Sequence, residues 1–230
     1  MDGALNIEPT GLRILIGCET SGVMRRAFSA LGHEAWSCDL LPADDGSNHH
    51  IRGDVRDHLD NGWDMLIVAH PPCTRLCNSG VRWLHVPPPG RTVEDMWREL
   101  DEGVDLFAAC WNAPIDRVAV ENPVMHKHAR ARLPADIPRP QIVQPWWFGE
   151  PFFKATGFYL RGLPALEATN RLSPPKAGTE DHKRWSAVHR APPGPDRWKF
   201  RSRTFEGVAA ACAEQWTAAA MEGGQRCVAF

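Results

Sequence analysis

The stretch that decides the fold is Asp64-Met-Leu-Ile-Val-Ala-His-Pro-Pro-Cys73, an apolar run that ends at two prolines and a cysteine. A continuous apolar run bounded by turn-forming residues is typical of a strand buried on both faces of a parallel sheet. In open α/β sheets, ligands bind beyond the carboxyl ends of the strands. Cys73 is therefore expected where a substrate can bind, on a loop stiffened by Pro71 and Pro72, and it is a candidate nucleophile.

Two strands and a helix are predicted before this run. Leu12-Arg-Ile-Leu-Ile-Gly-Cys18 is followed by a glycine-containing turn and by helical spacing from Val23, which predicts strand, turn and helix. Glu34-Ala-Trp-Ser-Cys-Asp39 is a second short strand, and its terminal acid lies close to the roughly 20-residue offset of a ribose-binding carboxylate. Asp54 is a third acid. The pattern suggests a nucleoside-bearing cofactor, but a glycine turn and a helix-capping Asp39 also occur for structural reasons alone.

The rest of the chain continues the alternation of helices and strands. Residues 92–112 have helical spacing of apolar side chains, and a proline-rich loop at 81–91 precedes them. Strands are predicted at 117–123, 141–146 and 156–161, and a last alanine-rich helix at 204–220. Between them, 164–200 has no clear period and is interpreted as a small irregular insertion. We therefore expect one α/β domain with a mostly parallel sheet and helices on both faces.

The composition is that of a soluble globular protein, with 43% hydrophobic and 23% charged residues among 230. No apolar stretch approaches the roughly 20 residues of a membrane span, and the N-terminus lacks the pattern of a signal peptide, so a cytoplasmic location is expected. The seven cysteines include no CxxC pair, which argues against a disulfide framework and a four-ligand zinc site. The sequence predicts no metal and no membrane contact, and it identifies no protein partner.

Positive charge is concentrated in one segment, although the net charge of −2 argues against extensive coating of nucleic acid. Residues 171–203, which we call the basic segment, contain nine Lys and Arg residues against three Asp and Glu residues. Tryptophans interleave with these cations, as on many nucleic-acid-binding surfaces. The basic segment is therefore either a local phosphate-binding surface or a solvated loop.

Two strand ends, taken together, resemble the cytosine-5 DNA methyltransferase family. Ala69-His-Pro-Pro-Cys73 is similar to the catalytic Pro-Cys loop of this family, and Val120-Glu-Asn-Pro123 is similar to its Glu-Asn-Val strand end. The resemblance covers residues 12–160 and 200–217, and it is greatest to the compact members of phages and prophages. It implies a Rossmann-like S-adenosylmethionine-dependent methyltransferase fold. Residues 1–163 and 201–230 would then form the catalytic domain, and 164–200 would replace a full target-recognition domain.

The resemblance also implies a site for S-adenosylmethionine. Ile16-Gly-Cys-Glu-Thr-Ser-Gly22 looks like the cofactor loop of the family, Asp39 like the acid on the ribose, and Asp54-Val55 like the pair that contacts the adenine. Arg203-Thr-Phe-Glu-Gly207 is similar to the closing helix that returns to the cofactor. The cofactor-binding residues implied in this way are Gly17, Cys18, Glu19, Thr20, Gly22, Asp39, Leu40, Asp54, Val55, Pro71 and Thr204.

The chain departs from the family pattern in several places. Pro123 stands where the family has valine, and the first loop carries fewer glycines. Lys154-Ala-Thr156 stands in place of the paired-arginine strand that helps to hold the target base. The target-recognition region is reduced to a short insertion, which predicts short or relaxed sequence specificity.

The chemistry of the family explains which residue types are needed. Carbon 5 of cytosine is a poor nucleophile, so a thiolate must first add to carbon 6 and generate an enamine. The resemblance assigns this step to Cys73, a proton or hydrogen bond at ring nitrogen 3 to Glu121, and the shape of the loop to Asn122. Lys154 takes the remaining basic position. Because duplex DNA hides carbon 6 in the base stack, the cytosine would have to be flipped out, with the basic segment on the DNA.

Ionisation of the thiol needs help from its surroundings. His70, Arg75 or Lys154 could lower the pKa of Cys73, although His70 fits a structural histidine equally well. His70, Cys73 and Cys77 also have a spacing that invites a metal, but the sequence offers no convincing fourth ligand.

Three alternatives remain open at this stage. The same thiol chemistry could use a folate-borne one-carbon unit to give hydroxymethylcytosine, or it could act on a free pyrimidine nucleotide. The chain could instead be a non-catalytic DNA-binding relative. An amino-group methyltransferase is disfavoured, because such enzymes need an Asp/Asn-Pro-Pro-aromatic loop, and here His70 and Cys73 flank the two prolines.

Overall fold

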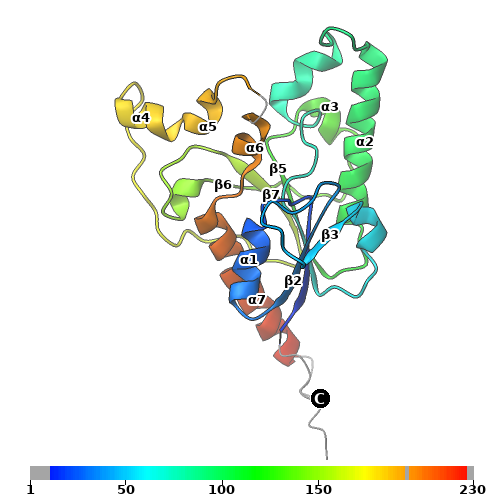
Figure 1. Ribbon diagram of the computed structural model, residues 1–230, viewed down its shortest axis with the longest axis vertical. Helices are drawn as coiled ribbons and strands as arrows, with labels where there is room; N and C mark the ends of the chain where they lie inside the picture. Colours follow the sequence, from blue (N-terminus) through cyan, green and yellow to red (C-terminus); the bar gives the residue numbers. More distant parts are fainter. Residues whose placement is uncertain (1–10, 195–196, 227–230) are drawn as a thin grey trace, which may run out of the picture.

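The computed structural model describes residues 11–194 and 197–226, and these form an α/β structure around a seven-stranded sheet (Figure 1). The strand order is β3-β2-β1-β4-β5-β7-β6. The first five strands in this order are parallel, and β7 is antiparallel to both β5 and β6. The mostly parallel sheet predicted from the sequence is confirmed. The strands are β1 (Arg13–Gly17), β2 (Glu34–Asp39), β3 (His50–Arg52), β4 (Met65–Val68), β5 (Arg117–Asn122), β6 (Gln141–Val143) and β7 (Thr156–Arg161).

Helices connect the strands and cover both faces of the sheet. The α-helices are α1 (Val23–Ala30), α2 (Val93–Trp111), α3 (Lys127–Arg130), α4 (Glu180–Trp185), α5 (Ala187–Arg190), α6 (Arg197–Ser202) and α7 (Glu206–Arg226). Short 3-10 helices are η1 (Val55–His58), η2 (Asn78–Leu84) and η3 (Pro145–Trp147). No helix among the described residues is long and apolar enough to cross a membrane.

Alternation along the central strands builds two hydrophobic cores. Leu66 and Val68 of β4 pack in the core that includes α2, whereas Met65 and Ile67 pack in the core that includes α1 and α7. All four side chains are fully buried, which explains why the sequence here reads as one continuous apolar run. Each such side chain contributes about 1.5–3 kcal/mol relative to exposure.

The two long helices are fixed at their ends and along their length. Thr92 caps the start of α2: its hydroxyl accepts the N–H of Asp95, and the Asp95 carboxylate accepts the N–H of Thr92 in return. In α7, Trp216 is fully buried and donates its indole N–H to the Pro164 carbonyl at 3.0 Å. The predicted helix at 92–112 is therefore confirmed, and the last predicted helix extends beyond its expected end.

The insertion is more regular than the sequence suggests, because 164–200 contains α4, α5 and the start of α6. These helices have four to six residues each, too few to display a helical period. The insertion is anchored to the loop before β7: the Phe153 N–H donates to the Trp185 carbonyl at 2.8 Å, and the two rings pack at 5.3 Å. In Figure 1, α4, α5 and α6 lie at the end of the molecule opposite the last turn of α7. The loop expected at 81–91 likewise begins inside η2.

Candidate active site

The strand ends that carry predicted site residues are neighbours in the sheet. β2, β1, β4 and β5 lie side by side in this order and end at Asp39, Gly17, Val68 and Asn122. The chain runs from β1 outward to β2 and β3, and it then returns to β4 on the other side of β1. The crevice beyond the carboxyl ends at such a switch point is the usual ligand site of an open α/β sheet.

A pocket of about 580 Å³ opens beyond the ends of β1, β2 and β3. Ligand pockets in proteins commonly measure roughly 300–1,000 Å³, so a nucleoside can fit this one. Five predicted cofactor residues line it, namely Cys18, Asp39, Leu40, Asp54 and Val55. The facing wall comes from α2 and from the loop after β4, with His70, Pro72, Thr74, Arg75, Glu99, Glu102, Gly103 and Leu106.

Carboxylates outnumber cations in this pocket, which we therefore call the acidic pocket. Its carboxylates are Asp39, Asp54, Glu99 and Glu102, and its arginines are Arg56 and Arg75. Arg56 pairs with Asp54 at 2.5 Å, and the Nε of Arg75 donates to Glu99 at 2.7 Å. The hydrogen bonds from Arg56 lower the pKa of Asp54. His70 adds no positive charge, because burial lowers its pKa to about 3.

The end of β1 lets η1 pack closely against it. A Cβ added to Gly17 would lie 2.8 Å from a methyl carbon of Val55, so only glycine lets η1 close over β1. Cys18 has a φ of 56°, and it is the one non-glycine residue with a positive φ in the described ranges. A non-glycine residue in this region costs of order 1–3 kcal/mol, and such outliers cluster at ligand sites. Cys18 lines the acidic pocket, whereas Gly17 supports it from behind.

Glu19 does not face the acidic pocket, although the family resemblance implies that it binds the cofactor. Its side chain is fully buried, and the carboxylate accepts the N–H groups of Met24 at 2.7 Å and Arg25 at 3.2 Å. It thereby satisfies free donors at the start of α1. Gly22, with a φ of 66°, makes the turn that precedes α1. Both residues therefore hold the loop, and neither lines the pocket.

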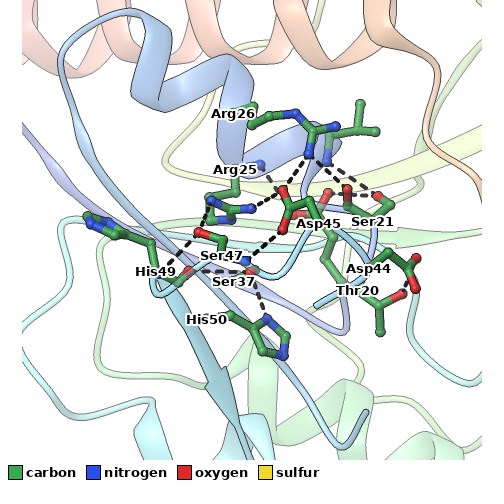
Figure 2. Close-up of polar contacts among 12 residues, drawn as sticks. Thr20, Ser21, Arg25, Arg26, Ser37, Asp44, Asp45, Ser47, His49 and His50 are labelled. Atoms are coloured by element: carbon green, nitrogen blue, oxygen red, sulfur yellow. Dashed lines mark hydrogen bonds and ion pairs between the residues drawn. The ribbon is translucent and has the colours of Figure 1, made fainter. Parts of the chain in front are cut away.

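Thr20 lies in a neighbouring pocket of about 510 Å³, which shares His70 with the acidic pocket. Figure 2 shows the contacts that hold the wall of this neighbouring pocket. The hydroxyl of Thr20 donates to Asp44 at 3.1 Å, and Asp45 pairs with both Arg25 and Arg26. These contacts tie the loop between β2 and β3 to the start of α1.

Cys73 lies on a tightly built loop after β4. Its carbonyl accepts the N–H groups of Leu76 at 2.9 Å and Cys77 at 3.0 Å. A Cβ added to Gly80 would lie 1.7 Å from the Thr74 carbonyl oxygen, so this glycine is required for the path of the loop. Cys73 is partly exposed and lies between Pro72 and Thr74, which line the acidic pocket, whereas Pro71 is buried and lines none of the pockets described here.

Glu121 and Lys154 meet in a third, much smaller pocket. This small pocket has a volume of about 20 Å³ and is lined by Met24, Ala69, His70, Glu121, Lys154, Thr156, Phe158, Thr204, Phe205 and Val208. Burial raises the pKa of Glu121 to about 7, although the positive charge of Lys154 opposes the shift. Burial lowers the pKa of Lys154, and the charges of Glu121 and Cys73 oppose that shift. The thiol of Cys73 is close enough that Glu121 helps to raise its pKa.

Polar contacts close the small pocket. Lys154 Nζ donates to the carbonyl oxygens of Ser202 at 3.4 Å and Arg203 at 3.0 Å, and the Thr204 hydroxyl lies 2.8 Å from His70 Nε2. Asn122 is fully buried beside Glu121, and its Nδ2 donates to the Pro123 carbonyl at 2.6 Å. The structure therefore brings Glu121, Lys154 and Thr204 together in the small pocket, and Cys73 lies on the loop that also carries His70. Asn122 supports the strand end without lining a pocket described here.

Some charged side chains of the basic segment are engaged in contacts within the protein. Arg171 packs over the Trp147 ring at 4.8 Å, Lys183 pairs with Glu180, and Arg184 pairs with Asp181. Lys176 and Arg190 are exposed. The side chains of Trp198 and Lys199, which the sequence places on the same surface, lie outside the described part. The segment ends at Arg203, next to the small pocket.

Sequence reasoning missed the α2 wall of the acidic pocket. Glu99, Glu102 and Gly103 have the spacing of residues on one face of a helix. This spacing, together with a glycine inside a helix, is the sequence signal that marks this wall of the pocket. A Cβ added to Gly103 would lie 3.3 Å from the Leu76 side chain and 3.5 Å from the Pro72 carbonyl oxygen, so α2 packs closely against the loop of Cys73 at this position.

Comparison with known proteins gives no family for this chain. No protein-family model matches it, and a search of curated proteins finds no significant match. Within the described ranges, no group of three or more His, Cys, Asp or Glu side chains is arranged to hold a metal ion.

Proposed function

We propose that this chain is a DNA cytosine-5 methyltransferase that uses S-adenosylmethionine and forms a covalent intermediate through Cys73. One observation carries the proposal: a carboxyl group with a pKa of about 7 and a buried lysine line the small pocket, which meets the nucleoside-sized acidic pocket at His70, on the loop that carries the thiol. They come from Cys73, Glu121 and Lys154, which the family resemblance selects independently.

The architecture supports a Rossmann-like cofactor-binding fold. The order β3-β2-β1-β4-β5 matches the strand order 3-2-1-4-5 of doubly wound nucleotide-binding sheets. In such sheets, a carboxylate at the end of the second strand binds the ribose hydroxyls, and Asp39 occupies this position. Asp54 and Val55 lie further along the same pocket, where they suit the adenine.

The charge of the acidic pocket favours a cationic nucleoside. Four carboxylates face two guanidinium groups, so a sulfonium ion is attracted, whereas the phosphates of a dinucleotide and the carboxylates of a folate are repelled. The donor set thus fits S-adenosylmethionine better than the folate donor of the hydroxymethylating alternative. When bound, S-adenosylmethionine would supply an electrophilic methyl group.

The residues around the small pocket have suitable chemistry for the acceptor. The sulfur of Cys73 would add to cytosine carbon 6, and Glu121 is protonated below pH about 7 and so can donate to ring nitrogen 3. Lys154 lies beside Glu121 and can hold a polar edge of the base. A base such as a water molecule would then take the proton from carbon 5, and the electron pair of that C–H bond would restore the ring double bond and release Cys73 as a thiolate.

The basic segment supports a nucleic-acid acceptor. It ends at Arg203, directly before Thr204 of the small pocket, so DNA bound along it would reach the residues that close this pocket. A base must leave the duplex to meet Cys73.

Mass spectrometry of nucleosides tests the proposal. DNA is taken from cells that express the wild type or Cys73→Ala, with Asn78→Ala, an exposed residue of the same loop, as the matched control. We expect 5-methylcytosine with the wild type and Asn78→Ala, and none with Cys73→Ala. If 5-hydroxymethylcytosine appears, the donor is a folate instead. Unmodified DNA in all three would contradict the proposal and favour a nucleotide acceptor or a non-catalytic DNA-binding protein.

A further inference from the structure

Positive charge also gathers around α3, outside the basic segment. Residues 123–139, which follow β5, contain four Lys and Arg residues against one Asp. Lys127, Arg130 and Arg132 of this segment are exposed. Because β5 runs parallel to β4 and β1, α3 follows a carboxyl strand end at the same edge of the sheet as the pockets.

The cations of α3 share one surface. Lys127 and Arg130 are three residues apart, and His128 and Arg132 are four apart, so each pair lies together on the helix surface. An Nη of Arg132 also donates to the His128 carbonyl oxygen at 3.3 Å. His85, directly after η2, adds a ring at 5.8 Å from that of His128. We call this surface the α3 face, and its residues are His85, Lys127, His128, Arg130 and Arg132.

Little negative charge compensates the α3 face from within the protein. In the part of the chain that the structure describes, no carboxylate pairs with Lys127, His128 or Arg130. Arg132 does pair with Asp101, at 2.7 Å. Partial burial lowers the pKa of His128, and the positive charge of its neighbours, above all Lys127, lowers it further. The α3 face therefore presents positive charge to the solvent.

Aromatic rings hold this face in place. The ring of Trp97, on α2, lies 4.9 Å from the guanidinium carbon of Arg132. The same ring packs edge-on against His128 at 5.3 Å and against His85 at 5.9 Å. A surface that is ordered before it binds loses less side-chain entropy on binding.

α3 is also fixed to the loop of Cys73. The His126 N–H donates to the Leu76 carbonyl at 3.0 Å. His126 Nδ1 accepts the N–H of Ala129 at 3.1 Å, so Nε2 carries the ring proton and donates to the Arg75 carbonyl at 2.6 Å. The α3 face is therefore held against the loop only a few residues after Cys73.

The other end of the same loop contacts the basic segment. His70 Nε2 lies 2.8 Å from the hydroxyl of Thr204, directly after Arg203. In Figure 1, α4 and α5 of the basic segment lie well apart from α3. The loop of Cys73 thus has one positive surface attached near its start and another near its end.

Duplex DNA matches this arrangement of charge. It carries one negative charge per roughly 1.7 Å of its length, so a duplex across the loop offers phosphates to both surfaces. The basic segment alone has few cations to spare, since Lys183 and Arg184 are already paired with Glu180 and Asp181. The α3 face supplies cations that lack such partners.

We propose that the α3 face binds the phosphate backbone of the DNA that flanks the target base, while the basic segment binds the same duplex on the other side of the loop of Cys73. Lys127 and Arg130 contact phosphates, and Arg132 contributes less because Asp101 holds it. The choice of DNA as the polyanion rests on the proposed function.

The salt dependence of DNA binding tests the α3 face. Fluorescence anisotropy measures binding of a labelled duplex of about 20 base pairs to the full chain, from about 50 to 200 mM NaCl. The variants are Lys127→Gln alone and the double variant Lys127→Gln/Arg130→Gln. The control is Arg98→Gln, an exposed arginine of the neighbouring α2 whose charge is paired with Asp95 at 2.8 Å.

Each lost phosphate contact lowers the slope of log K against log salt by about 0.9. The slope should therefore fall by about 0.9 in the single variant and about 1.8 in the double variant. At about 100 mM NaCl, the double variant should bind at least about tenfold more weakly than the wild type. Arg98→Gln should bind within about twofold of the wild type.

Three results would overturn the proposal: no binding of DNA by the wild type, a wild-type affinity and slope in the double variant, or an equal loss in Arg98→Gln. Polyglutamate serves as a second probe. If it binds through Lys127 and Arg130 more tightly than DNA does, the α3 face recognises an acidic protein instead.

The nucleoside analysis is independent of this measurement. If the double variant binds DNA weakly and the wild type leaves DNA unmodified, the α3 face stands and the methyltransferase is rejected. If the wild type makes 5-methylcytosine and the double variant binds DNA as the wild type does, the methyltransferase stands and the α3 face is rejected.

Discussion

The acidic pocket and the small pocket meet at His70, which lines both, yet they offer very different space. The acidic pocket measures about 580 Å³ and the small pocket about 20 Å³. On this measure a cavity needs about 10–15 Å³ to hold one water molecule, so no pyrimidine ring fits the small pocket as it stands. Under the proposed function, the acidic pocket is preformed for the cofactor, whereas the small pocket has to open before it can take the acceptor base. The groups that close it are Lys154 and Thr204, through their contacts with residues 202–203 and His70.

The largest expected effect separates the two pockets through Glu121. Glu121→Gln removes a proton donor from the small pocket and leaves the lining of the acidic pocket intact. General acid catalysis contributes about 10²–10⁴-fold, so DNA methylation should fall by this factor. S-adenosylmethionine should bind within about twofold of the wild-type affinity by titration calorimetry. Equal loss of binding and activity would show that the two pockets do not act separately.

The raised pKa of Glu121 also predicts that the stability difference between the wild type and Glu121→Gln depends on pH. Burial raises the pKa of Glu121 from its ordinary value near 4.5 to about 7, so the folded protein holds this proton where the unfolded chain has lost it. Its contribution is greatest below pH about 4.5, falls as the pH rises to about 7, and is constant above. At 1.36 kcal/mol per unit, the free energy of unfolding should fall by up to about 3 kcal/mol relative to Glu121→Gln. Urea unfolding of both proteins from pH 4.5 to 8 measures this difference, and a pH-independent difference would contradict the shift.

Most of the framework that carries both pockets could be predicted from the sequence. The run at 65–68 is apolar on both faces because both cores need it, and the ends of β1, β2 and β5 are marked by Gly17, Asp39 and Glu121. Because parallel strands end at one edge of a sheet, these residues are expected at the same edge. There Asp39 lines the acidic pocket and Glu121 lines the small pocket.

The rest depends on contacts between distant segments, which no local pattern reveals. Glu19 looks like a ligand-binding acid, but the N–H groups of Met24 and Arg25 occupy its carboxylate. The α2 wall and the pairing of His70 with Thr204, 134 residues apart, arise only when the chain is folded. The helices α4 to α6 are too short to show a period.

A smaller effect is expected in the acidic pocket, from a substitution of Asp39. Asp39→Asn removes a charge from the acidic pocket and retains an oxygen for the Leu41 N–H, which Asp39 accepts at 2.9 Å. A hydrogen bond to a charged group contributes about 1.5–3 kcal/mol, so S-adenosylmethionine should bind about 10–100-fold more weakly. Calorimetry measures this change. Asp60→Ala, an exposed acid outside the pocket, is the control and should bind as the wild type does.

The smallest effect is expected from the contact between Thr204 and His70, which helps to keep the small pocket closed. Thr204→Val keeps the shape of the side chain and removes its 2.8 Å contact with His70. Loss of one neutral hydrogen bond costs about 1 kcal/mol, so the segment before α7 should open about fivefold more often. Trypsin cleavage after the exposed Arg203 reports this opening, and its rate should rise by the same factor. Thr204→Ser retains the hydroxyl and should be cleaved at the wild-type rate. If Thr204→Val were also cleaved at that rate, Lys154 alone would hold the segment, and the small pocket would be closed by the lysine contacts.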